Sequence, residues 1–87
     1  MIKILFFARL KDQLNCSGLN LEINDLDNQS SITIRKLLDY LFNKNPSWQS
    51  TFEHQQVFIA VNQEIVGRET TIKDGDEVAF FPPVTGG

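Results

Sequence analysis

The stretch DGDEVAFFPPVTGG (residues 74–87) ends the chain and carries its clearest turn and strand signals. Asp-Gly-Asp predicts a turn, so a last strand is expected over residues 77–81. The two prolines that follow cannot donate the hydrogen bonds of a sheet, and they hold the backbone extended. The sequence therefore predicts a domain over residues 1–81 and an extended C-terminal arm over residues 82–87.

One main helix is predicted before this ending. Apolar side chains recur at spacings of three and four along residues 34–42, the pattern of a helix with one buried face. Ser31 or Thr33 is suited to cap its free N–H groups, and Pro46 forces its end. A short helical turn is also expected after residue 8.

The other elements are strands and loops. Strands are predicted over residues 2–8, 19–24 and 57–62, with a short strand around residues 65 and 66 and a polar loop over residues 25–31. Trp48 and Phe52 are expected to pack a short turn onto the core. Packing one helix on one face of a mixed sheet is the economical way to bury these apolar stripes, which predicts an α+β fold.

Alternation along the strands divides the side chains between two faces. Lys3, Glu77 and Asn62 should reach water, so side chains of the same parity should point outward with them. Small soluble monomers rarely expose a large apolar surface unless something binds there. The alternatives are a parity shifted at a bulge, or a loop that covers this face. The predicted outer side chains are Leu5, Phe7, Phe58, Ala60, Ala79 and Phe81.

Composition narrows the function classes. The 87 residues carry a formal net charge of −3, with acids and bases interspersed. This argues against a basic surface that binds nucleic acid and against a polybasic membrane anchor. The single cysteine, Cys16, excludes an internal disulfide and a multi-cysteine zinc site. With no export signal and no apolar run long enough to span a membrane, we expect a cytoplasmic protein.

The two terminal glycines suggest a chemistry for the arm. Gly86 and Gly87 carry no side chains, so they fit a channel too narrow for other residues. The carboxylate of Gly87 is a poor electrophile, but activation by ATP as an acyl-adenylate turns it into an acyl donor. This predicts Gly87 as the reacting residue of a chain that needs no catalytic side chain of its own.

Three stretches resemble one known family. MIKILFFA (1–8), AVNQEIV (60–66) and DGDEVAFFPPVTGG (74–87) are similar to the small subunit of molybdopterin synthase, the MoaD-type sulfur carriers with a ubiquitin-like β-grasp fold. The resemblance covers the whole chain in the order of its elements. It fades between residues 11 and 56.

The resemblance implies a sulfur-donating subunit of molybdopterin synthase in molybdenum cofactor biosynthesis. Gly87 would be adenylated by an E1-like adenylyltransferase, converted to a thiocarboxylate with sulfur from a donor protein, and used to sulfurate cyclic pyranopterin monophosphate. Two carriers would sit on a dimer of large subunits, a heterotetramer. No bound cofactor or metal is implied, and ATP serves the activating enzyme. Val84, Thr85 and Gly86 would enter the large subunit's active site, and the positions of Phe7 and Phe81 would face that subunit. Together with the strand parity, this predicts a partner interface of Phe7, Phe58, Phe81 and Pro82.

Other residues and other functions complete the set of hypotheses. Cys16 is expected to be an ordinary loop or half-buried thiol, and His54 a solvated loop residue. The Asp74-Gly75-Asp76 stretch lacks the ligand spacing of a calcium loop. The rival functions are a carrier for another pathway, such as the thiazole of thiamine, a ubiquitin-like protein modifier, and an adaptor with an inert tail.

Overall fold

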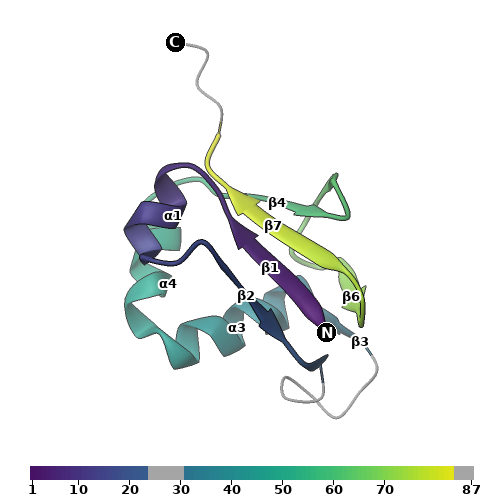
Figure 1. Cartoon of the computed structure of the whole chain (residues 1–87). Coiled ribbons are helices and arrows are strands. Elements are labelled where there is room, and N and C mark those ends of the chain that lie inside the picture. Colours follow the sequence, from purple (N-terminus) through teal and green to yellow (C-terminus); the bar gives the residue numbers. More distant parts are fainter. Residues whose placement is uncertain (24–30, 84–87) are drawn as a thin grey trace.

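A mixed sheet organises the computed structural model, which describes residues 1–23 and 31–83 (Figure 1). In the described residues this sheet has five strands in the order β2-β1-β7-β4-β5. The central pair, β1 and β7, is parallel, and the other neighbours are antiparallel. The strands are β1 (Ile2–Phe6), β2 (Gly18–Leu21), β4 (Phe58–Val61), β5 (Glu64–Val66) and β7 (Glu77–Phe81).

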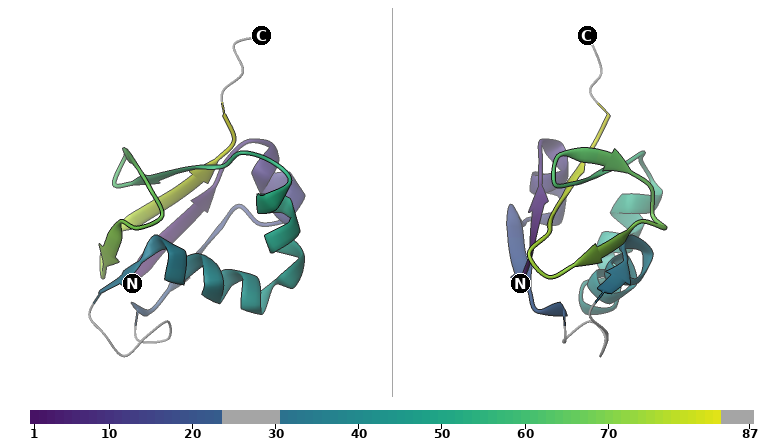
Figure 2. Two further views of the ribbon diagram at one scale, coloured as in Figure 1. Left: turned by 180° about the vertical axis from the view of Figure 1, so that it is seen from behind. Right: turned by 90° about the vertical axis from the view of Figure 1, so that its right-hand side faces the viewer.

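The predicted main helix is α3 (Ile34–Lys44), and it packs against one face of the sheet (Figure 2). Its start is capped as expected, because the Thr33 side-chain oxygen accepts a hydrogen bond from the backbone N–H of Lys36 at 3.2 Å. Phe42 is half-buried at the edge of the core. The fully packed face of the helix consists of Ile34, Leu37, Leu38 and Leu41.

Two further helices pack on the same core. The short helical turn expected after β1 is α1 (Arg9–Leu14). The short turn expected after Pro46 is a longer element, α4 (Pro46–Glu53), because a proline that ends one helix also fits the first turn of the next. Phe52 of α4 lies 5.6 Å from the ring of Phe80, and Trp48 lies 5.3 Å from that of Phe6. Both residues pack on the core, as predicted.

A second, two-stranded sheet was not predicted. It pairs β3 (Ser31–Thr33) with β6 (Thr71–Lys73), and each strand buries one isoleucine, Ile32 and Ile72. Ser31, expected in a loop, belongs to β3, and the rest of that predicted loop lies outside the described residues. The strand predicted over residues 19–24 ends at Leu21, although Ile23 is still buried.

The core lies between the five-stranded sheet and the helices. In register, Ile4 is opposite Val78, and Phe80 is opposite both Phe6 and Ile59. The right-hand view of Figure 2 shows α3 and α4 on one side of β1 and β2. The predicted inner parity is confirmed. Val61, opposite Val78, is half-buried, and the other inward side chains are buried: Ile2, Ile4, Phe6, Ile59, Val78 and Phe80.

Candidate functional site

The opposite face of the sheet carries the predicted apolar surface. Residues in register on neighbouring strands point to the same side. Ala79 is opposite both Leu5 and Ala60, and Phe81 is opposite Phe58. The rings of Phe58 and Phe81 lie 5.9 Å apart between centroids. The parity is therefore correct across β1, β7 and β4.

One residue of this face was missed by sequence reasoning, and one differs from expectation. Ile65 of β5 is opposite Ala60 and is 65% exposed. A two-residue turn at Asn62 and Gln63, both with positive φ, fixes this register, so the hairpin gives the signal that would have found it. Ala60 lies on the predicted face, but only 8% of it is exposed because its side chain is too small to rise between larger neighbours.

We call the resulting surface the outer face, and it is apolar mainly at one end. Lys3 is opposite Glu77 near the start of β1, which makes that end polar. At the other end Phe7 follows β1 and is 47% exposed. Its backbone N–H donates to the Phe80 carbonyl at 3.1 Å, which holds it beside the end of β7. The outer face consists of Leu5, Phe7, Phe58, Ile65, Ala79 and Phe81.

The C-terminal arm begins at this apolar end. Pro82 is buried and Pro83 is half-buried, so the first residues of the predicted arm pack against the domain. A partner contact by Pro82 stays a prediction, and burial limits the surface that it offers. Residues 84–87, which include Val84, Thr85, Gly86 and Gly87, lie outside the described residues, so their predicted roles are untested.

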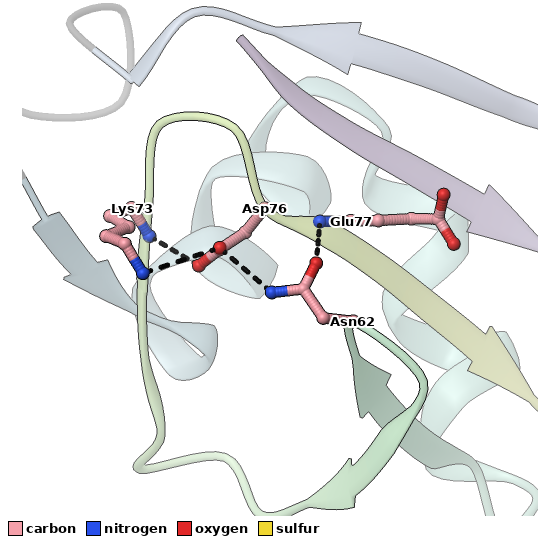
Figure 3. Close-up of polar contacts among 4 residues, drawn as sticks. All are labelled: Asn62, Lys73, Asp76 and Glu77. Carbon is pink, nitrogen blue, oxygen red and sulfur yellow. Dashed lines mark hydrogen bonds and ion pairs between the residues drawn. The ribbon is translucent and has the colours of Figure 1, made fainter.

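The turn before β7 forms a polar network at the opposite end of that strand (Figure 3). The Asp76 carboxylate accepts hydrogen bonds from the Lys73 backbone N–H at 2.9 Å and from the Asn62 side chain at 3.0 Å. The Asn62 side-chain oxygen accepts from the Glu77 backbone N–H at 3.0 Å. Asp74 pairs with the N-terminal amine of Met1. These contacts confirm the predicted turn and tie it to the hairpin at Asn62.

Asp76 is only 7% exposed, and two opposing effects set its pKa. Burial raises the pKa of the carboxyl group, because it disfavours the charged form. The hydrogen bonds from Lys73 and Asn62, with the nearby Lys73 ammonium group, favour the charged form and outweigh burial. The pKa of Asp76 therefore lies below its usual value, as expected for a structural carboxylate rather than a proton donor.

The remaining candidate residues take ordinary positions. Cys16 is half-buried, and its thiol lies 3.4 Å from the Gly18 carbonyl, so the prediction of a half-buried thiol is confirmed. His54 is exposed just after α4. Residues 1–23 and 31–83 contain no group of three or more His, Cys, Asp or Glu side chains arranged to hold a metal ion. Across those same residues, every helix is too short or too polar to cross a membrane.

The chain is similar to known proteins in sequence and in fold. The model of the ThiS family matches residues 4–87. The molybdopterin synthase sulfur carrier subunit of Haemophilus influenzae is 33% identical over 87 residues, which is 100% of both chains. The crystal structure of SAMP1 from Haloferax volcanii superimposes with a TM-score of 0.77 at 23% identity, covering 99% of this chain and 98% of that one.

A third relative was solved together with a partner. In the complex of subunits 1 and 2 of molybdopterin-converting factor from Helicobacter pylori, the matching chain has a TM-score of 0.65 and 21% identity. The match covers 99% of this chain and 97% of that one. The two structural matches show the shared fold, which is the predicted ubiquitin-like β-grasp fold.

Proposed function

Because this chain belongs to the ThiS family, we propose that it is the sulfur carrier subunit of a molybdopterin synthase. The observation that carries this proposal is the full-length similarity to the H. influenzae protein of that name. The chain ends in Gly86-Gly87, and the outer face lies beside the start of its C-terminal arm. A carrier needs these two features, because it must deliver a chain end while a partner holds the domain.

The chemistry takes place at the carboxyl carbon of Gly87. The carboxylate oxygen attacks the α-phosphorus of ATP, and pyrophosphate leaves to give an acyl-adenylate. A persulfide on a donor protein then displaces AMP to give an acyl disulfide. A thiol cleaves its S–S bond, which releases the thiocarboxylate and leaves a disulfide. When this sulfur passes to the pterin precursor, water supplies the oxygen that restores the carboxylate. The chain contributes the reacting carbon, and its partner enzymes contribute the catalytic side chains.

The outer face is suited to bind the synthase large subunit. A relative of this fold was solved in complex with a second subunit of molybdopterin-converting factor. Phe7, Phe58 and Phe81 lie around the beginning of the arm, so a partner that covers them is placed to receive the arm as well. Two carriers on a dimer of large subunits would supply the two sulfur atoms of the product. The reaction would take place in the cytoplasm.

Two rival functions share the fold and the Gly-Gly ending. A carrier for thiamine thiazole remains the nearest alternative, and the name of the full-length relative favours molybdopterin over it. A protein modifier would form isopeptide bonds with lysine side chains. The likeness to the small archaeal modifier protein of H. volcanii, at 23% identity, concerns the fold and does not favour that function.

Intact-mass analysis tests the proposal. The purified chain is incubated with the activating enzyme of its own organism, ATP and a sulfur donor. We expect the mass to rise by the difference between one sulfur and one oxygen atom, and the large subunit with the pterin precursor to reverse this gain. The matched control carries one extra residue after Gly87, and it should melt like the parent but gain no sulfur. A parent chain that gains no sulfur, or that becomes conjugated to lysines instead, would refute the proposal.

A further inference from the structure

The junction between β1 and α1 has an unusual backbone conformation at Ala8. Its φ is 57° and its ψ is −140°. These angles lie outside the main regions open to L-residues and close to the first central position of a type II′ turn, where glycine dominates because it has no Cβ atom. Asn15, at the other end of α1, also has a positive φ, but its ψ of 42° places it in the left-handed region that asparagine tolerates. The backbone of Ala8 is therefore strained, whereas that of Asn15 is ordinary.

The surroundings of the Ala8 side chain do not offset this strain. Ala8 is exposed, so burial of its methyl group contributes little to stability. Glycine adopts such angles freely, and it would keep the same chain path without the strain. Strained residues of this kind gather at functional sites, where the strain is part of the mechanism. The presence of alanine at this position therefore points to a role other than stability.

The chain is fixed on both sides of Ala8. Before it, the Phe7 backbone N–H donates to the Phe80 carbonyl at 3.1 Å, one residue beyond the end of β1. After it, the Ala8 carbonyl accepts from the Lys11 backbone N–H at 3.1 Å, and Leu10 is 0% exposed in the core. Figure 1 shows the chain turning from β1 into α1 at this point. Ala8 makes the turn that leads the chain from the outer face to the core beneath α1.

Phe7 directly precedes this turn and depends on it for the direction of its ring. Phe58 and Phe81, the other aromatic residues of the outer face, contact each other with ring centroids 5.9 Å apart. Among residues 1–23 and 31–83, the Phe7 ring has no such aromatic partner, and Phe7 is 47% exposed. The direction of this ring is therefore set mainly by the backbone, which the hydrogen bond to Phe80 fixes on one side and Ala8 on the other.

We propose that Ala8 is a positioning residue for Phe7: its methyl group restricts the backbone of the junction, so that the Phe7 ring is presented to the synthase large subunit in a nearly fixed direction. This inference rests on the proposed function, in which the outer face binds that subunit. Alanine has only a small allowed area near these angles, whereas glycine occupies a wide range of φ and ψ around them. The methyl group lowers the stability of the free domain, but it strengthens binding because less freedom is lost when the partner fixes the ring.

The first test compares two glycine variants of the full chain. Ala8→Gly should raise the melting temperature by about 5 °C, because it removes the strain. The same variant should weaken binding to the large subunit about threefold in Kd, because the ring must now be ordered on binding. The matched control is Asn15→Gly, which also replaces a residue of positive φ at an end of α1. It should melt at or slightly above the temperature of the parent and leave Kd unchanged, because glycine is the preferred residue at such a helix end.

Two further measurements connect the effect of Ala8 to Phe7. In a double-mutant cycle with Phe7→Ala, the change Ala8→Gly should leave Kd unchanged, because the ring that it would position is absent. In the free chain, nuclear magnetic resonance relaxation reports the order of the backbone N–H groups. The order parameter at residue 8 should fall from about 0.85 in the parent toward about 0.6 in Ala8→Gly, although the variant melts at a higher temperature.

A D-alanine at position 8 separates strain from restriction. For a D-residue the angles of Ala8 are the mirror image of the extended conformation that L-residues prefer, so the strain disappears while a methyl group still restricts the backbone. The full chain can be assembled by ligating a synthetic segment of residues 1–15 to the remainder at Cys16, the single cysteine. Ala8→D-Ala should melt at a temperature at least as high as that of Ala8→Gly, and it should keep the Kd of the parent.

Several outcomes would overturn this inference. An equal Kd in the parent and Ala8→Gly would show that the methyl group does not assist binding. An effect of Ala8→Gly that persists in Phe7→Ala, or an equal loss of binding in Ala8→D-Ala, would assign the effect to a direct contact of the methyl group with the partner. A lower melting temperature in Ala8→Gly would show that Ala8 is not strained. A parent chain that does not bind the large subunit would refute the proposed function instead, and the order parameters of the free chain test the restriction at Ala8 independently of that result.

Discussion

The two faces of the five-stranded sheet are built from the same strands but lie in different surroundings. Phe80 and Phe81 are neighbours in β7, and both are aromatic. Phe80 is 0% exposed beneath the helices, whereas Phe81 lies half-buried against Phe58 on the outer face. The comparison teaches that side-chain type alone does not separate core from interface. The parity of the strand, together with the position of the helices, makes that distinction.

The difference has an energetic meaning. Inner side chains contribute their burial to the stability of the isolated domain, at roughly 25 cal/mol for each Å² of apolar surface removed from water. Exposed outer side chains such as Phe7 and Ile65 make that contribution only when a partner covers them. Substitutions on the inner face should therefore change the free energy of unfolding, and substitutions on the outer face should change the free energy of binding.

The largest expected effect is on the inner face. Phe80→Ala removes a ring that lies 5.8 Å from that of Phe6 and 5.6 Å from that of Phe52. We expect the free energy of unfolding to fall by about 3–5 kcal/mol, the usual cost of losing a buried phenylalanine. Denaturant unfolding followed by circular dichroism measures this loss. A variant as stable as the parent would mean that the assignment of the two faces is wrong.

The next effect is the opposite one, on the outer face. Phe81→Glu places a charge where a partner would exclude water, and it removes an aromatic anchor. We expect binding to the large subunit to weaken by about 2 kcal/mol or more, roughly thirtyfold in Kd. The free domain should lose only about 1 kcal/mol, the order of an aromatic pair such as the one with Phe58. Calorimetric titration and thermal melts separate the two quantities.

A loss of stability without a loss of binding in Phe81→Glu would contradict the assignment of the two faces. If Phe81→Glu unfolded the domain and left binding intact, the outer face would be part of the core. Ile65→Glu provides a second test on the same face, because Ile65 is 65% exposed and lies on the edge strand β5. It should leave the melting temperature unchanged and show whether the partner reaches that edge.

Much of this comparison could be predicted from the sequence, because it depends on local patterns. The predicted last strand has the observed bounds, and Lys3 and Glu77 correctly marked the outward parity of β1 and β7. The buried face of α3 and its cap at Thr33 could also be predicted from the sequence. These features depend on neighbours a few residues apart, where alternation and capping act directly.

The features that were missed depend on distant or ambiguous residues. β3 and β6 are three residues long and pair across a large separation in the chain, so each has only one buried isoleucine as a signal. Pro46 was interpreted as the end of α3, but a proline equally begins a helix, and Trp48 and Phe52 have the spacing of one helical turn. Arg9 and Gln13 of α1 line a polar groove together with residues of α4, and only the tertiary structure brings these two helices together.

The smallest expected effect concerns the one buried charged group of the described residues, Asp76. Asp76 has the same parity as Val78 and Phe80, so it continues the inner face at the start of β7. Asp76→Asn replaces one acceptor oxygen by an amide donor that faces another donor. We expect the variant to lose about 1 kcal/mol at neutral pH, the net value of one hydrogen bond. Asp74→Asn, in the same turn but exposed, should change the stability by less than about 0.5 kcal/mol.

The pH dependence of unfolding tests the same contribution of Asp76, and its direction can be predicted. The folded state lowers the pKa of Asp76, so the unfolded chain binds its proton more readily. The contribution of Asp76 is therefore fully present above the ordinary aspartate pKa of about 3.9, and it is lost as the pH falls through the lower folded value. Between about pH 5 and pH 2 the parent should lose more stability than Asp76→Asn, and the two melting curves should converge. If the difference in stability between the parent and the variant stays constant across this range, the negative charge of Asp76 does not stabilise the turn before β7. The loss at neutral pH would then come from the shape of the side chain alone.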